Sequence, residues 1–287
     1  MADTSTAVGA GSTPVKWGLR FLVVAYLVML VAWPSAYVVK TTFDGGLTNL
    51  QEALSDPDVL HALKLSGVVA LAAVAINLVF GVGMSLLLVR SRFPGRRVLS
   101  ALLDLPLAVS PIVVGLALVL VYNGRFGWFG PTLEAHGLQV IFAEPGMIMA
   151  TCFVALPLVI REVVPVLEDM GEEQEQAAQS LGATAWQTFW RVTLPGIKWA
   201  VVYGVVLSLA RSLGEFGAVK VVAGNVSGET TTATVLVQQK YQNFEQGTAY
   251  AISFLLAIAA VVCLVVVALL RPQDHRPAKT AKTEENA

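Results

Sequence analysis

Charged residues and cysteines are scarce in this sequence. Only 19 basic and 20 acidic residues occur among 287, so that 14% of the chain is charged, whereas a typical soluble domain carries about 25%. The formal net charge of −1 leaves no basic excess for binding nucleic acid. The two cysteines, Cys152 and Cys263, lie inside apolar runs. A thiol there acts as a small hydrophobic side chain, so a disulfide-stabilised secreted fold is excluded.

Sequence motifs for catalysis and nucleotide binding are also missing. No G-x-x-x-x-G-K-[ST] loop is present to hold nucleotide phosphates. The three histidines lie in separate polar segments, and none has a second histidine four residues away. Gly83-Met84-Ser85 begins like a nucleophile elbow but lacks the closing glycine. We therefore expect that this chain is not an enzyme and that it holds no catalytic residue, metal or cofactor.

Long apolar runs dominate the sequence instead. Hydrophobic residues make up 55% of it, and they gather near 21–39, 65–89, 105–122, 146–160, 199–223 and 248–270. These lengths are close to the roughly 20 residues with which a helix crosses a hydrocarbon core of about 30 Å. A β-barrel would show alternating strands of about ten residues, so continuous runs predict helices. The expected fold class is an all-α, polytopic integral membrane protein with six transmembrane helices.

The basic residues between the spans predict the orientation. One set of segments comprises both termini and the loops after the second and fourth spans. It holds 13 basic residues: Lys16, Arg20, Arg90, Arg92, Arg96, Arg97, Arg161, Arg191, Lys198, Arg271, Arg276, Lys279 and Lys282. The other three loops hold four: Lys40, Lys64, Arg125 and Lys240. Because basic loops stay in the cytoplasm, both termini are predicted to be cytoplasmic.

The two ends of the chain differ from the spans in composition. Residues 1–18 are rich in Ala, Gly, Ser and Thr, and we expect them to be disordered. Residues 271–287 are polar and charged, which predicts a solvated tail. The membrane domain is therefore expected to cover residues 19–270.

The predicted cytoplasmic loop at 161–198 has a pattern of its own. Ala177, Ala178 and Leu181 lie on one side of a predicted helix, and small side chains there permit close approach to another surface. Gly182 suits a left-handed helix end, and Pro195 suits the first turn of the helix that re-enters the membrane. The pattern predicts a short helix, a sharp turn and a second amphipathic piece.

The second amphipathic piece carries Trp186, Phe189 and Trp190. Two interpretations of this loop remain open on the pattern alone. The aromatic rings could rest among lipid headgroups, as in an interfacial helix, or the loop could dock on another protein.

The same loop resembles the EAA motif of ABC-importer permeases. That motif reads E-A-A, three residues, a glycine, nine residues, and then I-x-L-P. Here Ala177, Ala178, Gly182, Leu194 and Pro195 match it, Val192 replaces its isoleucine, and Gln176, with Glu175 beside it, stands at its glutamate. The resemblance implies that residues 172–195 couple the chain to an ATPase through Glu175, Gln176, Ala177, Ala178, Gly182, Leu194 and Pro195.

Further stretches resemble the sulfate and thiosulfate permeases of the CysW type. They include L-H-A-L-K-L at 60–65, N-L-V-F-G at 77–81, R-F-P-G-R at 92–96 and L-G-E-F-G-A at 213–218. The resemblance covers about 47–270 and implies a type I ABC-importer permease fold in the bacterial cytoplasmic (inner) membrane. It also implies four partners: a second, T-type permease, two ATP-binding subunits that hold ATP and Mg²⁺, and an extracytoplasmic sulfate-binding protein.

The predicted fifth span contains Arg211, Glu215 and Lys220. A charge at mid-membrane costs about 2.5 kcal/mol or more, so such residues usually face a bundle interior or a wet cavity. Arg211 and Glu215 are four residues apart and would share a helix face. They could form a structural ion pair, or Arg211 could offer its guanidinium to a passing oxyanion while Glu215 holds it between turnovers.

Two rival functions stay open at this point. The cargo could be molybdate or tungstate, whose permeases resemble this sequence in the fifth span and the preceding loop. The chain could also be a secondary transporter that works without ATP, although we see no repeat symmetry in the sequence.

Overall fold

The computed structural model describes residues 13–270, and every regular element in this range is a helix. The predictions for residues 1–12 and for the tail at 271–287 lie outside the described residues. In chain order the elements are α1 (Thr13–Leu27), the π-helix η1 (Val28–Ala32), α2 (Trp33–Phe43), α3 (Thr48–Ser55), α4 (Pro57–Arg90), α5 (Arg96–Ala108), α6 (Pro111–Tyr122), α7 (Gly130–Ala135), α8 (Glu144–Met170), α9 (Glu173–Ser180), α10 (Ala185–Thr188), the π-helix η2 (Phe189–Thr193), α11 (Leu194–Leu213), α12 (Gly217–Val222), α13 (Ala233–Gln242) and α14 (Gln246–Leu270).

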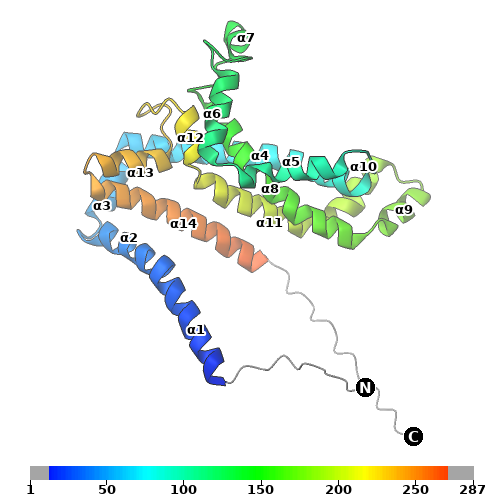
Figure 1. The fold of residues 1–287 in the computed structure, drawn as a ribbon, viewed down its shortest axis with the longest axis horizontal. Helices are drawn as coiled ribbons and strands as arrows, with labels where there is room; N and C mark the ends of the chain where they lie inside the picture. Colours follow the sequence, from blue (N-terminus) through cyan, green and yellow to red (C-terminus); the bar gives the residue numbers. More distant parts are fainter. Residues whose placement is uncertain (1–12, 271–287) are drawn as a thin grey trace, which may run out of the picture.

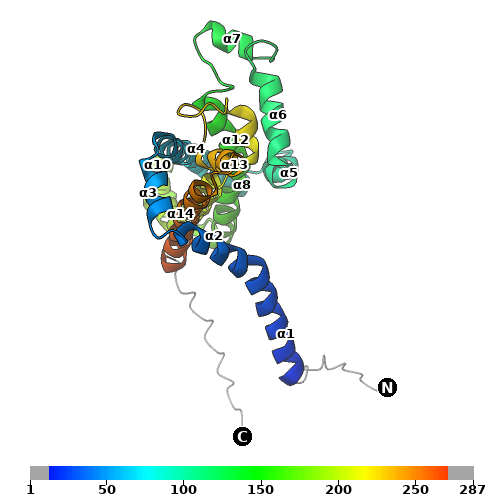
Figure 2. The same cartoon turned by 90° about the vertical axis from the view of Figure 1, so that its left-hand side faces the viewer.

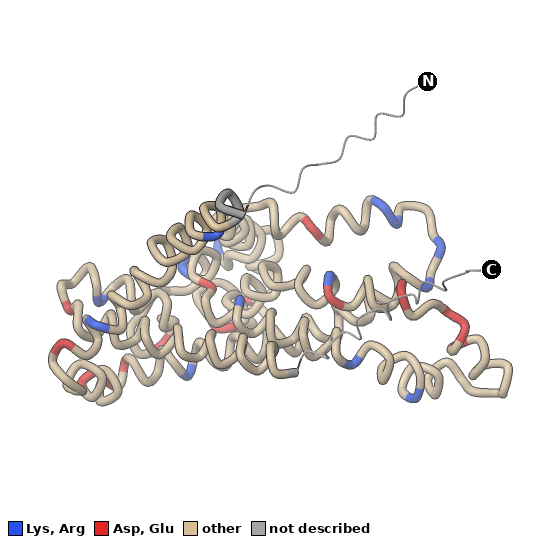
Figure 3. Tube along the Cα trace, turned by 90° about the horizontal axis from the view of Figure 1, so that it is seen from below, with Lys and Arg blue, Asp and Glu red and all other residues tan. Residues whose placement is uncertain are grey.

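Five helical stretches in the described range are long and apolar enough to cross a membrane. They are Trp17–Phe43, Pro57–Arg90, Glu144–Met170, Ala185–Leu213 and Gln246–Val266. The bent pair α5 and α6 makes a sixth candidate when it counts as one span. Long stretches of the tube in Figure 3 carry no charge, as a lipid environment requires.

Helices α4, α8 and α11 form the centre of the fold. Helix α8 packs along both α4 and α11, and Val159 of α8 lies between a glycine of each. A Cβ on Gly81 would lie 2.8 Å from Val159 Cγ1, and one on Gly204 would lie 2.9 Å from Val159 Cα. Small residues at such positions let helix backbones approach closely, which stabilises packing in membranes.

Helices α4 and α8 run parallel. The last residue of α4, Arg90, contacts the carbonyl of Leu167 near the end of α8, and Leu65 and Val69 of α4 share a buried cluster with Met147, near the start of α8. The segment between the two helices must therefore return the chain to the end where α8 begins. Figure 1 places α9 and α10 at one end of this bundle and α3 and α13 at the other.

The returning segment is broken, so the predicted span 105–122 is not one continuous helix. Its two parts, α5 and α6, meet at an angle of 109°. The break comes at Val109 and Ser110, both with extended backbone, and Pro111 then occupies the first turn of α6. A residue before proline avoids helical geometry, and proline lacks the N–H that would continue the helix. The chain is thus fully broken at this point. Helix α6 packs on α12 and, less extensively, on α8, and α7 projects beyond it (Figures 1 and 2).

The predicted span 199–223 is also wrong as a single helix. Helix α11 ends at Leu213, and α12 begins only at Gly217. Between them the Glu215 carboxylate accepts a hydrogen bond from the backbone nitrogen of Ala218 at 2.9 Å. A side chain that bonds the backbone locally competes with helical hydrogen bonding, which accounts for the break.

The N-terminal stretch from α1 to α2 lies at the edge of the fold. Its apolar window has no buried residue, and α2 touches α14 through the ring pairs Phe43–Phe254, at 5.2 Å, and Tyr37–Tyr250, at 6.3 Å. Residues 13–18, which were predicted to be disordered, begin α1 instead. Pro14 sits there in the first turn, a position that suits proline, and the apolar run follows at once.

The end of the bundle opposite α9 is held by ion pairs. Lys240 Nζ lies 3.1 Å from Asp56 Oδ2 and 2.7 Å from Glu245 Oε2. Burial by itself would raise the pKa of Asp56, but the hydrogen bonds from Lys240 and from the backbone of Asp58, together with the Lys240 charge, hold that pKa below its ordinary 3.8. These contacts join the start of α4 to α13.

Candidate functional site

The predicted helix, turn and second piece of the 172–195 loop are confirmed. Helix α9 ends at Ser180, and Gly182 follows with a φ of +89°. The backbone nitrogen of Ala183 bonds the carbonyl of Ala178 at 3.1 Å, and that of Gly182 bonds Gln179 at 2.9 Å. This pattern is a Schellman turn, in which glycine is favoured because its φ is positive. A Cβ on Gly182 would meet nothing within 4 Å, so the requirement concerns backbone conformation and not space.

The second piece begins with a capping box. The backbone nitrogen of Gln187 donates to Thr184 Oγ1 at 3.3 Å, and the backbone nitrogen of Thr184 donates to Gln187 Oε1 at 3.0 Å. The spacing T-x-x-Q is the sequence signal that could have predicted this arrangement. The turn after α9 is thus defined on both sides by local hydrogen bonds.

Most of the predicted coupling residues face outward. No residue of α9 is buried, Gln176 and Ala177 are exposed, and Ala178 is half-buried. Leu181 is 90% exposed, which is unusual for a leucine outside lipid. Ala178, Leu181 and Gly182 line a cleft of about 340 Å³ against α10 and η2. This end of the loop therefore has an apolar surface that no other part of the described chain covers.

The remaining motif residues lie where the loop joins α11. Leu194 is half-buried beside the cluster that includes Val163 and Ile197, and Pro195 is exposed in the first turn of α11, as predicted. Trp186 and Trp190 are exposed, with ring centroids 5.5 Å apart. Both interpretations of these aromatic residues, lipid contact and protein docking, stay open.

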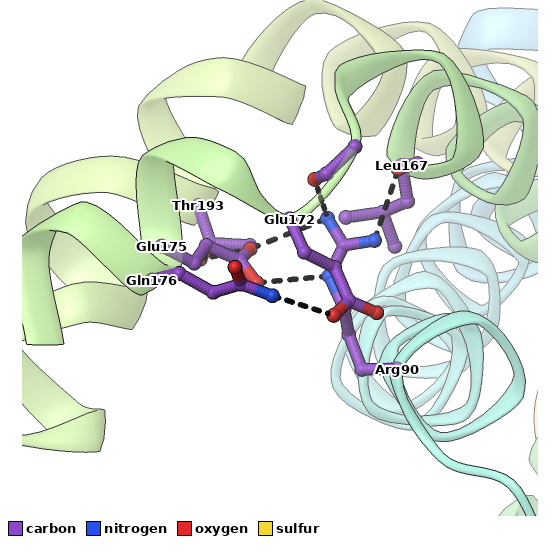
Figure 4. A network of polar contacts seen from close by, with 7 residues as sticks. Arg90, Leu167, Glu172, Glu175, Gln176 and Thr193 are labelled. Atoms are coloured by element: carbon purple, nitrogen blue, oxygen red, sulfur yellow. Dashed lines mark hydrogen bonds and ion pairs between the residues drawn. The ribbon is translucent and has the colours of Figure 1, made fainter.

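Glu175 does not share the outward orientation of its neighbours. Its Oε2 lies 2.8 Å from Nε of Arg90 on α4, and its Oε1 accepts a hydrogen bond from Thr193 Oγ1 at 2.7 Å. Gln176, at the glutamate position of the motif, contacts only Glu172 among these polar groups, at 3.3 Å. Figure 4 shows Glu175 and Arg90 pointing toward one another from different helices. In the sequence, Arg90 was only one of the basic residues that predict the orientation.

The predicted pair in the fifth span is present. Arg211 Nη1 lies 2.8 Å from Glu215 Oε2, with Arg211 40% exposed and Glu215 2% exposed. Helix α11 ends at Leu213, so the two residues do not share a helix face as predicted. Instead, Glu215 lies in the break between α11 and α12, where its backbone carbonyl also accepts a hydrogen bond from Thr234 Oγ1 at 2.7 Å.

Around this pair there are buried polar atoms that lack a hydrogen-bond partner. Within residues 13–270, Oγ of Ser208 and of Ser212 have no hydrogen-bond partner, and Glu215 Oε2 contacts Arg211 as an ion pair without hydrogen-bond alignment. Buried polar groups are normally paired, so each exception calls for an explanation. The structure thus brings one half-exposed guanidinium and several unsatisfied oxygens to the α11–α12 break.

The third charge of this region, Lys220, lies on α12. Its Nζ donates a hydrogen bond to Gln238 Oε1 of α13 and lies 5.2 Å from the centre of the Phe216 ring. These contacts account for a lysine in an apolar stretch. The residues of the described chain contain no cluster of three or more His, Cys, Asp or Glu that could hold a metal ion.

Residues 77–277 match the family model described as "Binding-protein-dependent transport system inner membrane component". The sulfate transport system permease protein CysW of Synechocystis sp. is 45% identical over 256 residues, covering 89% of this chain and 92% of that protein. The CysW protein of Escherichia coli (strain K12) is 41% identical over 291 residues, covering 100% and 99%. The CysT permease of the same strain is 39% identical over 225 residues, covering 78% and 81%.

Solved structures show the same arrangement of helices at low sequence identity. A bacterial ABC transporter that imports the acidic polysaccharide alginate superimposes with a TM-score of 0.73 and 17% identity, covering 89% of this chain and 93% of that one. A second structure of an alginate transporter, in complex with an alginate-bound periplasmic protein, gives 0.72 and 17%, covering 89% and 92%.

Proposed function

Because the chain belongs to the family of binding-protein-dependent transport system inner membrane components, we propose that it is the W-type permease subunit of an ATP-driven sulfate importer. It is an all-α, polytopic protein of the inner membrane with the type I ABC-importer permease fold, and it is not an enzyme. The observation that carries the proposal is its 41–45% identity to CysW sulfate permeases over 89–100% of its length.

The chain works with partners that supply capture and energy. Its likeness to both CysW and CysT proteins supports a permease pair with a T-type subunit, and an alginate transporter solved with a periplasmic protein supports delivery by an external binding protein. Two ATP-binding subunits hold ATP and Mg²⁺ and dock on the α9 end. The sequence of this chain has no phosphate-binding loop of its own.

The α9 end faces the cytoplasm, and so do both termini. The 13 basic residues that flank the spans on that side support this orientation. The exposed Leu181, the exposed Ala177 and the half-buried Ala178 then present an apolar face where an ATPase subunit docks, and Gly182 sets the turn that shapes it.

An energy source is needed because the cargo is a dianion. A membrane potential of about 100 mV, negative inside, opposes each entering negative charge by about 2.3 kcal/mol, or about 4.6 kcal/mol for sulfate. Capture outside removes the need for a tight site in the permease, since a pathway must release what it binds.

The α11–α12 break is the pathway element of this chain. Its half-exposed Arg211 guanidinium meets the oxyanion and returns to Glu215 afterwards, so that a breakable ion pair acts as a gate. The hydroxyls of Ser208 and Ser212 nearby are buried and have no hydrogen-bond partner, so a hydrated anion could use them only when this gate opens.

Uptake of labelled sulfate by sulfate-starved cells tests the proposal. Cells that lack the gene lose uptake, and the intact chain restores it together with its partner subunits. Thiosulfate in excess competes if it shares the pathway. If sulfate uptake is unchanged and molybdate-dependent enzyme activity falls instead, the importer assignment survives and the cargo is molybdate or tungstate. Uptake that persists without the ATPase subunits would contradict the ATP-driven mechanism and favour a secondary transporter.

A further inference from the structure

The contact between Arg90 and Glu175 joins elements that belong to different parts of the chain. Arg90 is the last residue of α4, and Glu175 lies in the first turn of α9, 85 positions later. Both side chains are mostly covered, with 16% of Arg90 and 12% of Glu175 exposed. An ion pair at such burial is screened by solvent much less than a surface pair.

All three nitrogens of the Arg90 guanidinium are occupied. Nε donates to Glu175 Oε2 at 2.8 Å, Nη1 donates to the carbonyl of Leu167 at 3.1 Å, and Nη2 donates to the carbonyl of Gly171 at 2.8 Å. The two carbonyls belong to the last turn of α8 and its end, where a cation is favourable to the helix dipole. The planar fork of arginine suits several acceptors at fixed angles, which a lysine cannot meet together.

Gly171 makes this geometry possible. It has a φ of +67° and a ψ of −168°, a region of backbone conformation that is essentially restricted to glycine. The backbone conformation of Gly171 lies at the junction of α8 and α9, and its carbonyl accepts the hydrogen bond from Arg90 Nη2.

Glu175 also links α9 to the start of α11. Thr193, which is buried at the end of η2 directly before α11, donates its hydroxyl to Glu175 Oε1 at 2.7 Å. One carboxylate therefore receives hydrogen bonds from the end of α4 and from the start of α11. Through Arg90 it is also tied to the end of α8.

The rest of α9 has little to hold it against the bundle. None of its residues is buried, so apolar packing contributes little to its position. The three helices joined by the Arg90 network are also the ones that form the centre of the fold.

From these contacts we propose that Arg90 is the positioning residue that fixes α9 to α4, α8 and α11, so that a push on α9 moves these helices as one body. This rests on the proposed function, in which α9 receives the push from an ATPase subunit. Without Arg90, α9 moves relative to the three helices when the ATPase subunit displaces it. Less sulfate is then transported for each ATP hydrolysed.

The test uses the full complex in proteoliposomes, with uptake and ATP hydrolysis measured on the same preparation. Arg90→Ala is expected to lower sulfate uptake roughly tenfold while hydrolysis stays within about twofold. Arg90→Lys is expected to be intermediate, because an ammonium can reach Glu175 but not both carbonyls as well. Adding Glu175→Gln to Arg90→Ala is expected to cause little further loss, since both changes remove the same contact.

Arg96→Ala is the matched control. Arg96 lies at the same end of the bundle, and its contact with Glu168, at 3.7 Å between two well-exposed side chains, is long. We expect the ratio of uptake to hydrolysis in this variant to equal that of the unchanged complex. An unchanged ratio in Arg90→Ala would overturn the inference. So would loss of the Arg90→Ala subunit from the membrane combined with an unchanged ratio in Glu175→Gln, because Arg90 would then serve folding alone.

Hydrogen exchange of the assembled complex tests the same point without any cargo. Amides of residues 173–182 are expected to exchange faster in Arg90→Ala, while those of the α8 centre, at 154–163, stay protected. Unaltered exchange in α9 would contradict the inference. If the unchanged complex moves no sulfate, the proposed function fails by itself, and the exchange result still decides the role of Arg90.

Discussion

At the scale of single residues, the loop at 172–195 shows how neighbours of similar chemistry take opposite roles. Gln176 occupies the glutamate position of the motif and is exposed, whereas Glu175 turns inward to Arg90 and Thr193. The position of the motif's glutamate therefore carries no charge here, and an acid one position earlier holds the loop to the bundle. Spacing along a helix decides this, since consecutive residues point about 100° apart.

Gly182 is needed for its backbone conformation, and this can be tested with two substitutions. Gly182→Val is expected to destabilise the turn by about 1–2 kcal/mol or more, because a side chain disfavours a positive φ. Gly182→Asn is expected to behave almost normally, since asparagine tolerates this conformation and a Cβ there has free space. Sulfate uptake and co-purification of the ATPase subunits measure the effect. Normal uptake by the valine variant would rule out a coupling role for this turn.

Arg211 and Glu215 are expected to differ in importance. Arg211→Ala removes the guanidinium that would meet the anion, and we expect uptake to fall roughly 10- to 100-fold, the range for a lost charge-assisted hydrogen bond. Glu215→Gln keeps an oxygen for the backbone nitrogen of Ala218, so a smaller loss is expected. Initial rates of uptake at equal subunit levels provide the comparison. Equal losses with less protein in the membrane would indicate a purely structural ion pair.

At the scale of the elements, prolines within apolar segments do not all interrupt a helix. Helix α8 continues through Pro157 and Pro165, whereas the chain turns by 109° just before Pro111. The difference lies in the packing of the next helix, because α6 lies against α12, where a Cβ on Gly115 would lie 2.8 Å from the carbonyl oxygen of Ala218. The proline residues alone do not separate the two cases, whereas the contact of α6 with α12 does.

The close packing of α8 with α11 predicts a strong effect of one methyl group. Gly204→Ala places a Cβ 2.9 Å from Val159 Cα, and such overpacking is expected to cost about 1–3 kcal/mol. The control is Gly83→Ala on α4, where a Cβ meets nothing within 4 Å and the better helix propensity of alanine adds up to about 1 kcal/mol of stability. Thermal unfolding of the two variants in detergent measures the difference. A Gly204 variant as stable as the Gly83 variant would contradict this packing.

At the scale of the whole molecule, two of the ion-pair networks lie at opposite ends of the bundle. Lys240 with Asp56 and Glu245 joins the start of α4 to α13, and Arg90 with Glu175 joins its other end to α9. Helix α4 extends over 34 residues, which is long enough to cross the membrane between them. In the proposed mechanism, a displacement of α9 reaches the opposite side of the membrane through this one helix.

The proposed orientation can be tested with two matched substitutions. Gln174→Cys and Gln242→Cys introduce exposed thiols at opposite ends of the bundle (Figure 1), in a chain with Cys152 and Cys263 changed to alanine. We expect a membrane-impermeant maleimide to label residue 242 in intact cells and residue 174 only after the cells are opened. Labelling of residue 174 in intact cells would show that the orientation is the opposite of the proposed one.

Much of this protein is determined by the sequence alone. The apolar runs predict membrane helices because a backbone in lipid must satisfy its own hydrogen bonds. The helix, the glycine turn and the second piece of the 172–195 loop are confirmed because they depend on residues within a few positions of one another. The pairing of Arg211 with Glu215 is local in the same way, since four residues separate them.

Other features were decided by the tertiary structure. The Arg90–Glu175 contact spans 85 positions, and Val159 fits between Gly81 and Gly204 of two different helices. No local sequence pattern predicts either of these two contacts. Each depends on which helices lie side by side and on how the chain returns between α4 and α8. The sequence determines where the helices form and how the loop turns, while packing decides which helices the loop is attached to.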